Sequence, residues 1–316
     1  SGLDNELKSA YADTGAMHVL AVSGLHTGFI YLLIQYLLKL IPLRSLRWQI
    51  IKTVTIILCL WAFAFITGLS PSVLRSATMF SFVTVGLAIK RQSSIYNTLA
   101  ASAFCLLLFN PLLLFAPGFQ LSYLAVAGIV YFHPVVYRLI FIKNKVVDYL
   151  WKLVGVSIAA QLSTFPLSLY YFHKVPLYFW LSGLIVVPAA AIILPLGLLL
   201  FALDKVPFLG WMIGKLLNGI IWVMNSLIFF LQGLPGTFLD GIWTGPLVFL
   251  LICFAIVALV FILENKQAKW VIAGMSSLLL IACNSLYSNW QYLRQKEVVI
   301  YYQKGEVGKA IENYEK

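Results

Sequence analysis

Long apolar runs, each close to the length of a membrane-spanning helix, recur along nearly the whole chain. A helix needs roughly 20 apolar residues to cross a bilayer core about 30 Å thick. The runs predict ten helices, some of which would be re-entrant or broken rather than complete crossings. They lie at 20–41, 50–68, 73–89, 95–116, 118–133, 150–172, 177–203, 208–231, 245–263 and 270–287.

The composition supports this pattern. Apolar residues make up 61% of the chain and charged residues only 10%, whereas a soluble domain carries roughly a quarter charged residues. Several prolines fall in or beside the apolar runs, and broken helices are tolerated at membrane depth where they face protein or water. We therefore expect an all-α polytopic membrane protein in which several helices are broken.

The formal net charge of +11 is unevenly distributed. In a soluble protein it would suggest nucleic acid or an acidic partner, but here the retention of basic loops on the cytoplasmic side explains most of the excess. The loops around 69–72, 111–117 and 232–244 carry almost no basic residues. The loops that alternate with these are basic, through Lys39, Arg44, Arg47, Lys52, Lys90, Arg91, Arg138, Lys143, Lys145, Lys266 and Lys269.

This alternation predicts the topology. With ten crossings and the basic loops in the cytoplasm, both chain ends lie outside, and His173 and Lys174 are mild exceptions on the outer side. Residues 1–287 would form a transmembrane channel domain. The polar segment 288–316, with its strand-like VVIYY run before a glycine-containing turn, would open an extracytoplasmic soluble region.

The N-terminal segment is polar and starts at Ser1 without methionine. Because it has neither a basic n-region nor a short apolar core, we expect no signal peptide. The chain could be a piece of a longer protein.

Polar groups inside a bilayer are expensive, so each one needs a partner or a purpose. The first such place is the HVLAVSGLH segment. On a continuous helix His18, Val22 and His26 would share a face, and Ser23 with Gly24 could break the helix or pack it tightly. The two histidines would then line a polar cavity, or each would bond a carbonyl group of a neighbouring helix.

Arg75 is the second place. Ser70 and Pro71 fit the N-cap and first turn of a helix, which would put Arg75 about one turn into the membrane from the outer face. It could snorkel outward. Alternatively, it could project into a pore and bind phosphate, for which its planar fork is suited, with help from the helix N-terminus.

Two further segments carry amides and hydroxyls. Gln120 begins a span beside aromatic residues and could bond a base edge or a neighbouring helix. Gln161 and Thr164 are three residues apart and share a helix face. The run Tyr170–His173 at the outer end could be an interfacial aromatic belt or a platform on which bases stack. His173 is included among the candidate channel-lining residues.

Catalytic motifs are missing. The sequence has no GxxxxGK[ST] phosphate loop, no GxSxG elbow, no HExxH and no carboxylate pair placed for acid–base work. Asp204 stands at a span end next to Lys205. The cysteines lie in apolar runs without a CxxC pair, so we expect no metal site, disulfide or cofactor. Catalysis by this segment is not expected.

Four motifs resemble the ComEC competence proteins. HVLAVSGLHTG at 18–28 is similar to the family's HLLAxSGLH signature, and SPSVLRSATM at 70–79 to its PPSxxRA element. NPLLLFAPGFQLSYLAVAGI at 110–129 and QLSTFPLSLYYFHKVPLYFWLSGLIVVPAA at 161–190 resemble two later elements, in the same order and spacing. One departure is Ser182-Gly183, where the family often has an asparagine.

The resemblance implies a bacterial inner-membrane channel that passes one strand of transforming DNA while the other is degraded outside. Many full-length members add an OB-like domain and a metallo-β-lactamase-like nuclease domain. This sequence shows neither, so nuclease activity is not carried over. The implied partners are single-stranded DNA, the lipid membrane, a cytoplasmic motor or single-strand-binding protein, and an extracytoplasmic DNA receptor or nuclease.

The resulting hypothesis has helices carrying eight polar residues converge on a path for single-stranded DNA. These residues are His18, Ser23, His26, Arg75, Gln120, Gln161, Thr164 and His173. Two rivals remain. A secondary transporter of a small anion or lipid precursor would also use broken helices and a buried arginine. A membrane enzyme would use His18, Ser23 or His26, but no orienting carboxylate lies near them in the sequence.

Overall fold

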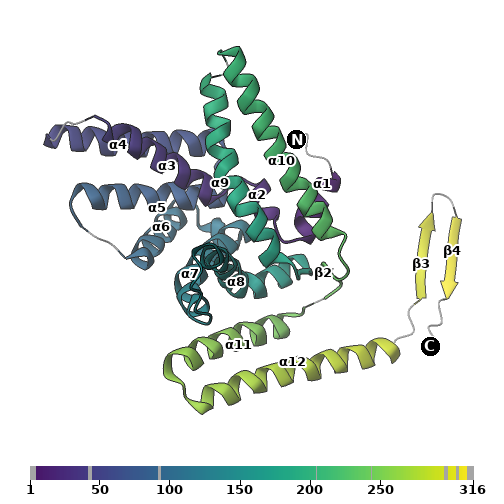
Figure 1. The fold of residues 1–316 in the computed structure, drawn as a ribbon. Coiled ribbons are helices and arrows are strands. Elements are labelled where there is room, and N and C mark those ends of the chain that lie inside the picture. Colours follow the sequence, from purple (N-terminus) through teal and green to yellow (C-terminus); the bar gives the residue numbers. More distant parts are fainter. Residues whose placement is uncertain are drawn as a thin grey trace. The chain divides into compact units, whose positions relative to one another are not determined.

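A computed structural model describes residues 5–41, 45–91, 94–203, 205–242, 244–294, 298–303 and 306–311. The predicted Arg44 and Asp204 positions lie outside these residues. The chain divides into two compact units, Ser1–Trp243 and Thr244–Lys316. The described residues of both units are almost entirely helical, with twelve α-helices (Figure 1). The all-α class is therefore confirmed.

The first unit holds ten of the helices found in the described ranges. They are α1 (Asn5–Asp13), α2 (Met17–Leu20), α3 (Gly24–Lys39), α4 (Leu46–Ile66), α5 (Pro71–Ala88), α6 (Ile95–Phe109), α7 (Pro117–Tyr137), α8 (Lys145–Phe172), α9 (Phe179–Leu203) and α10 (Pro207–Gln232). A 3₁₀ turn, η1 (Pro111–Phe115), precedes α7, and strands β1 (Val175–Pro176) and β2 (Phe238–Leu239) pair antiparallel.

Local signals start these helices where the sequence places them. The side chains of Ser45, Ser94 and Asn144 accept hydrogen bonds from the first backbone N–H groups of α4, α6 and α8. Pro71 and Pro117 occupy the first positions of α5 and α7, where the missing N–H would have no helical partner. These local signals thus account for the starts of five helices, α4 to α8.

Seven helices are long and apolar enough to cross a membrane, as judged over the described residues. They are α4, α7, α8, α9, α10, α11 and α12. Their windows are only 6–22% buried within the protein, so most of their apolar surface is left for lipid. Of the other predicted spans, α3 has 16 residues, α5 has 18 and α6 has 15. The protein is a polytopic membrane protein.

One predicted helix is interrupted. On a continuous helix His18, Val22 and His26 would share a face, but α2 ends at Leu20 and α3 begins at Gly24. Ala21 and Ser23 have extended backbone conformations. The chain therefore breaks at Ser23-Gly24, one of the two possibilities that the sequence offered, and His18 and His26 do not share a helix face. The cause is local, because the Ser23 backbone N–H donates to His26 Nδ1 at 3.2 Å and so holds the start of a new helix.

Prolines act differently at different positions. The predicted 95–116 span ends at Phe109, and Pro111 opens the 3₁₀ turn before α7. In contrast, α8 continues through Pro166, and α9 continues through Pro188 and Pro195. Pro111 thus stands where a helix has already ended, whereas the long helices α8 and α9 remain helical on both sides of their internal prolines.

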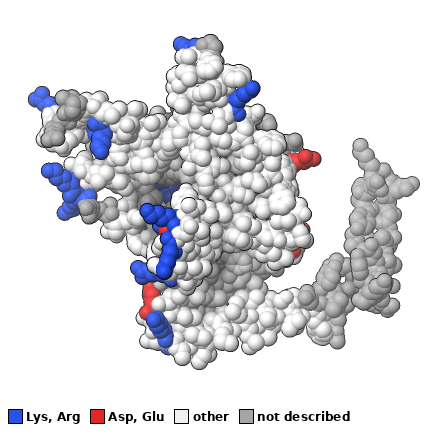
Figure 2. All heavy atoms as spheres, viewed as in Figure 1, with Lys and Arg blue, Asp and Glu red and all other residues white. Residues whose placement is uncertain are grey.

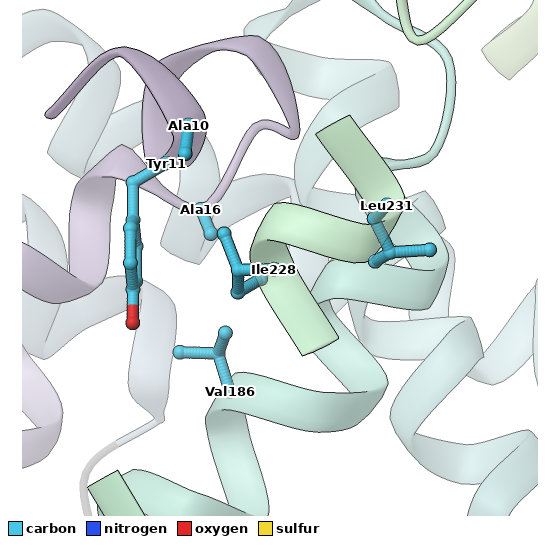
Figure 3. Packing of buried hydrophobic residues seen from close by; sticks show 6 residues of the cluster. All are labelled: Ala10, Tyr11, Ala16, Val186, Ile228 and Leu231. Atoms are coloured by element: carbon cyan, nitrogen blue, oxygen red, sulfur yellow. The ribbon is translucent and has the colours of Figure 1, made fainter. Parts of the chain in front are cut away.

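The short helix α1 is anchored to α9 and α10. Figure 3 shows Ile228 of α10 between Ala16 and Val186, with Tyr11 alongside. Tyr11 is fully buried, and its hydroxyl donates to Asn225 Oδ1 at 2.7 Å. Ser182 of α9 donates to the Thr14 carbonyl oxygen at 2.7 Å. These contacts fix the path of the chain that leads into α2 and α3.

Helices α3, α4 and α5 form a second packed group. Tyr31 of α3 is buried against Ile56 and Leu60 of α4. Its ring stacks on Phe80 of α5 with centroids 4.7 Å apart. This contact sets the spacing of α3 and α5 two turns after the start of α3.

The α7–α8 pair is closely packed through small residues. A methyl group at Gly128 of α7 would overlap the Ser163 side chain of α8. Reciprocally, a methyl group at Gly155 of α8 would lie 3.3 Å from the His133 ring of α7. Each helix therefore supplies a notch that receives a side chain of the other.

The second unit is a helix pair followed by a hairpin. Helices α11 (Pro246–Asn265) and α12 (Ala268–Arg294) pack together, with Phe261 and Trp270 stacked at 4.2 Å. Strands β3 (Val298–Gln303) and β4 (Glu306–Ile311) pair antiparallel. The strand predicted from VVIYY is confirmed, and α12 extends beyond the predicted end of its span at 287.

Candidate functional site

Arg75 lies in the second turn of α5 and is almost completely buried. Its side chain is 9% exposed. Nε donates a 2.6 Å hydrogen bond to Ser122 Oγ on α7, and Nη1 lies 3.7 Å from Met79 Sδ. The guanidinium is therefore drawn toward α7, inside the unit. This geometry does not match the snorkelling alternative, in which the head group would reach the surface.

No carboxylate of the described residues pairs with Arg75. The ion pairs in those residues join Asp148 to Lys152 and Asp13 to Lys174. A buried charge is normally paired or hydrogen-bonded because desolvation is costly. The partners of Arg75 are a neutral hydroxyl and a thioether, so most of its donor capacity and its whole charge remain without an acidic partner.

The N-terminus of α3 faces the same guanidinium. A methyl carbon added at Gly24 would lie 2.9 Å from Arg75 Nη2 and 2.7 Å from Ser76 Oγ. The absence of a side chain at Gly24 is therefore what allows α3 to begin against α5 at this point. Ser76 itself donates to the Ser72 carbonyl oxygen at 2.7 Å.

Ser23 and His26 organise this helix start. The Ser23 backbone N–H donates to His26 Nδ1, and Ser23 Oγ is 3.0 Å from the same nitrogen. A backbone N–H can only donate, so this bond assigns the lone pair to Nδ1 and leaves the proton of the neutral ring on Nε2. His26 therefore offers one remaining donor beside the Arg75 region.

Three predicted residues thus meet at one place: Ser23, His26 and Arg75 are joined through Gly24. Sequence reasoning did not assign a site role to Ser76 or Ser122, and treated Gly24 only as a helix breaker. The signal for Ser122 was a small polar residue in a membrane helix. Its partner on α5 follows only from the packing of the two helices.

The other predicted residues have different surroundings. Gln120 accepts from the Tyr171 hydroxyl at 2.9 Å and donates to the Leu114 carbonyl oxygen at 2.7 Å. It thereby links α7, α8 and η1, in agreement with the helix-to-helix alternative. The Thr164 hydroxyl bonds the Ala160 carbonyl oxygen of its own helix at 2.8 Å. Gln120 and Thr164 therefore stay candidates for lining the predicted DNA path, with their polar groups already bonded within the protein.

His18, Gln161 and His173 are not connected to Arg75 by any described contact. His18 is exposed, and its Nδ1 lies 3.2 Å from the Gly15 carbonyl oxygen. Gln161 is half-buried in α8, and its amide makes no hydrogen bond within the described ranges. His173 ends α8 in the left-handed conformation with φ of 54°. Their lining role stays a prediction.

One face of the first unit is hollowed. Figure 2 shows a shaded recess in the viewed face of the first unit, with basic side chains near its mouth. Two other hollows have volumes of about 520 and 580 Å³. One is lined by Lys39 and Lys52, and the other by apolar residues of α9 and α10. Neither contains a predicted site residue.

The described residues include no group of three or more His, Cys, Asp or Glu side chains that could hold a metal ion. The available chemistry of the site is therefore that of a guanidinium, an imidazole, hydroxyl groups and a helix N-terminus. All of these except the hydroxyl oxygens and His26 Nδ1 are donors. The arrangement is suited to binding an anion.

Long apolar helices packed around a buried arginine that has no acidic partner among the described residues define a polytopic membrane protein. The chain belongs to the Competence protein family, which matches residues 1–266. The ComEC resemblance is thereby confirmed. No solved structure matches the chain.

Two relatives illustrate the membership. "ComE operon protein 3" of Bacillus subtilis (strain 168) is 32% identical over 186 residues, which are 59% of this chain and 23% of the relative. "Uncharacterized protein YcaI" of Escherichia coli (strain K12) is 28% identical over 198 residues, 60% of this chain and 25% of the relative. The chain thus spans about a quarter of the length of these relatives.

Proposed function

We propose that this chain forms the membrane path through which a bacterium imports single-stranded DNA during transformation. The observation that carries the proposal is the placement of Arg75: nearly buried, without a carboxylate, and at the meeting of α3, α5 and α7. A DNA strand presents one phosphate per nucleotide, and the end of the guanidinium that Ser122 and Met79 leave unused can bind one through a charge-assisted hydrogen bond.

A single strong phosphate contact suits passage better than many. Binding in a channel must be favourable enough for entry and weak enough for exit. Apart from Arg75, the Lys and Arg residues of α3 and α4 and the first one after α5 lie toward the helix ends away from Gly24 and Pro71, at Lys39, Arg47, Lys52 and Lys90. Sparse interior charge therefore supports transit rather than storage of the strand.

Polar and aromatic groups along α7 and α8 would complete the path. Gln161 offers an amide without a described partner. The rings of Tyr170 and Tyr171 lie edge to face at 5.6 Å, and Gln120 holds the Tyr171 hydroxyl. Aromatic rings on which bases stack contribute about 1–3 kcal/mol per base. We include Thr164, His18 and His173 in the walls of the same path.

The membrane placement follows the charge pattern. We place the protein in the cytoplasmic membrane with the basic helix ends inside and both chain ends outside. Residues 1–287 would form the channel domain, and 288–316 would begin an extracytoplasmic region. The described residues show no energy-converting motif, so a cytoplasmic motor or single-strand-binding protein would pull the strand, and an outer receptor or nuclease would supply it.

The test is a transformation assay with Arg75→Ala. Loss of a hydrogen bond to a charged group, worth about 1.5–3 kcal/mol, should lower the number of transformants by about tenfold or more. Arg91→Ala is the matched control, because Arg91 is an exposed arginine just beyond the other end of α5. Immunoblots of membranes would establish equal protein levels. Normal uptake with Arg75→Ala would refute the proposal.

The same buried arginine also suits a secondary transporter of a small anion or lipid precursor. Purified protein in liposomes separates the two functions. Arg75-dependent flux of a small anion, together with normal transformation by the Arg75→Ala strain, would favour the transporter. Absence of flux with loss of transformation would favour DNA import.

A further inference from the structure

Two positively charged features face each other at Gly24. The N-terminus of an α-helix carries the equivalent of about half a positive charge, and α3 begins at Gly24 with its first backbone N–H groups outside the helical ladder. The Arg75 guanidinium approaches this point, as the 2.9 Å separation from an added methyl carbon shows. Without a negative group between them, this juxtaposition is repulsive.

The described surroundings supply no such group. From α5, Ser76 donates to a carbonyl group of its own helix. From α7, Ser122 accepts from Arg75, and the Tyr123 hydroxyl lies 2.9 Å from Ser102 Oγ on α6. From α3, His26 is bonded to Ser23. Each of these neighbours is neutral or a donor, so none of the described residues places a negative charge between Arg75 and the start of α3.

We infer that the α3 N-terminus and Arg75 together form a binding site for one phosphate group, and that the missing side chain at Gly24 lets the guanidinium come close enough to the helix start for the two to share it. Helix N-termini bind phosphate through free N–H groups. Here a second element, a nine-tenths-buried arginine with its Nη2 end directed at the helix start, is independent of the helix. The inference rests on the proposed function only for the source of the phosphate.

The nitrogen atoms of the Arg75 guanidinium have two different roles. Nε is used by Ser122 and Nη1 approaches Met79, which anchors the guanidinium to α5 and α7. Nη2 is the end nearest Gly24 and is left for the ligand. Three sources offer the same group: the backbone of a DNA strand, a phospholipid headgroup and free inorganic phosphate.

Gly24→Ala is the sharpest variant. Alanine is compatible with a helical position and improves helix propensity, so the fold should be retained. Its methyl group, however, would collide with Arg75 Nη2 and Ser76 Oγ and so push the guanidinium away from the helix start. Gly28→Ala is the matched control, because Gly28 lies one turn later on α3 and faces Phe80 of α5, at 3.3 Å from an added methyl carbon.

The first experiment measures thermal unfolding of the purified chain in zwitterionic nanodiscs. Phosphate and chloride are compared at equal ionic strength, since a ligand that binds only the folded state raises Tm. We expect phosphate to raise Tm for the natural chain and for Gly28→Ala, but not for Gly24→Ala or Arg75→Gln. Equal phosphate effects in all four proteins would overturn the site.

The second experiment identifies the source by competition. A fluorescent single-stranded oligonucleotide should bind about tenfold more weakly to Gly24→Ala than to Gly28→Ala, and inorganic phosphate should displace it. Nanodiscs containing phosphatidylglycerol form the lipid arm. Phosphate-dependent Tm shifts without oligonucleotide binding would support the site but contradict DNA import. If Gly24→Ala abolished transformation but left the phosphate-dependent Tm shift unchanged, the result would contradict the phosphate site and leave DNA import standing.

Discussion

Ser122 determines the direction of the Arg75 side chain. It supplies the 2.6 Å acceptor for Nε, and without it the flexible arginine would lose its anchor on α7. We class Ser122 as a positioning residue. Its role can be tested because threonine keeps the hydroxyl that alanine removes.

We expect Ser122→Ala to weaken phosphate-dependent stabilisation by about threefold to tenfold, as expected for one hydrogen bond to a charged group. Ser122→Thr should retain most of the effect. The phosphate concentration that gives half of the maximal Tm shift is the measurement. If both variants lost the effect equally, the hydroxyl would not be the cause.

Asp13 connects three segments. Its carboxylate accepts from Lys174 Nζ at 3.2 Å, from Gln232 Nε2 at 3.0 Å and from Ser9 Oγ at 3.1 Å. The carboxylate is buried, whereas Lys174 is half-exposed, so solvent weakens that pair. The hydrogen bonds rather than the charge should hold α1 in place.

Asp13→Leu should therefore destabilise the fold by about 1–3 kcal/mol, because it removes the three hydrogen bonds that the buried carboxylate accepts. Thermal unfolding in detergent gives the value. The control is Glu6→Leu, which changes an exposed acidic residue of the same helix. Equal unfolding temperatures for the two variants would show that the Asp13 contacts do not support α1.

At the scale of elements, the α7–α8 seam depends on glycine. Gly128→Ala would place a methyl group onto Ser163 and 3.0 Å from the Ala159 carbonyl oxygen. Overpacking of this kind costs about 1–3 kcal/mol. Gly197→Ala in α9 is the counterpart, since an added methyl group there meets nothing within 4 Å.

We expect opposite signs for these two substitutions. Gly128→Ala should lower the unfolding temperature, whereas Gly197→Ala should leave it unchanged or raise it through helix propensity. Circular dichroism during heating would show both. A destabilised Gly197→Ala protein would indicate that helix propensity does not govern α9.

The elements were largely predictable because membrane helices are marked by uninterrupted apolar runs and end at caps. The span predicted at 177–203 is α9, at Phe179–Leu203, and the one predicted at 208–231 is α10, at Pro207–Gln232. The break before Gly24 was predicted only as one of two possibilities for Ser23 and Gly24, because Ala21 and Val22 continue the apolar run. Only the bond between Ser23 and His26 reveals it.

The site was predictable in part for the same reason. Arg75, Ser23 and His26 stand out as polar residues within apolar surroundings. Their convergence through Gly24, and the anchoring by Ser122, depend on how α3, α5 and α7 pack, which no local pattern specifies. Gln120 and Thr164 also stand out in the sequence, yet Gln120 bonds Tyr171 and Leu114 and Thr164 bonds its own helix, and none of these bonds reaches Arg75.

At the scale of the whole molecule, the two ends of the helices in the first unit differ in position and in charge. Figure 1 shows the α3–α4 and α9–α10 pairs extending in different directions from a centre near α2 and the start of α3. Figure 2 shows basic side chains at the outlying ends of these pairs. The ends that meet at the centre are those that the charge pattern assigns to the outer face.

Cysteine labelling in intact cells tests this orientation. In a background that lacks the native cysteines, a cysteine at Glu6 should react with a membrane-impermeant maleimide, and one at Lys90 should react only after lysis; both positions are exposed. Reaction of both before lysis, or of Lys90 alone, would reverse or reject the proposed topology.

The stacked pair Tyr31–Phe80 gives the phosphate site a mechanical consequence. Helix α5 is bonded to α7 through Arg75. When the site is empty, the repulsion between the guanidinium and the α3 N-terminus should therefore move α3 rather than α5. The ring stack, two turns further along, would then serve as the pivot. We expect α3 to tilt about it between loaded and empty forms, which spin labels on α3 and α7 would register as a change in separation.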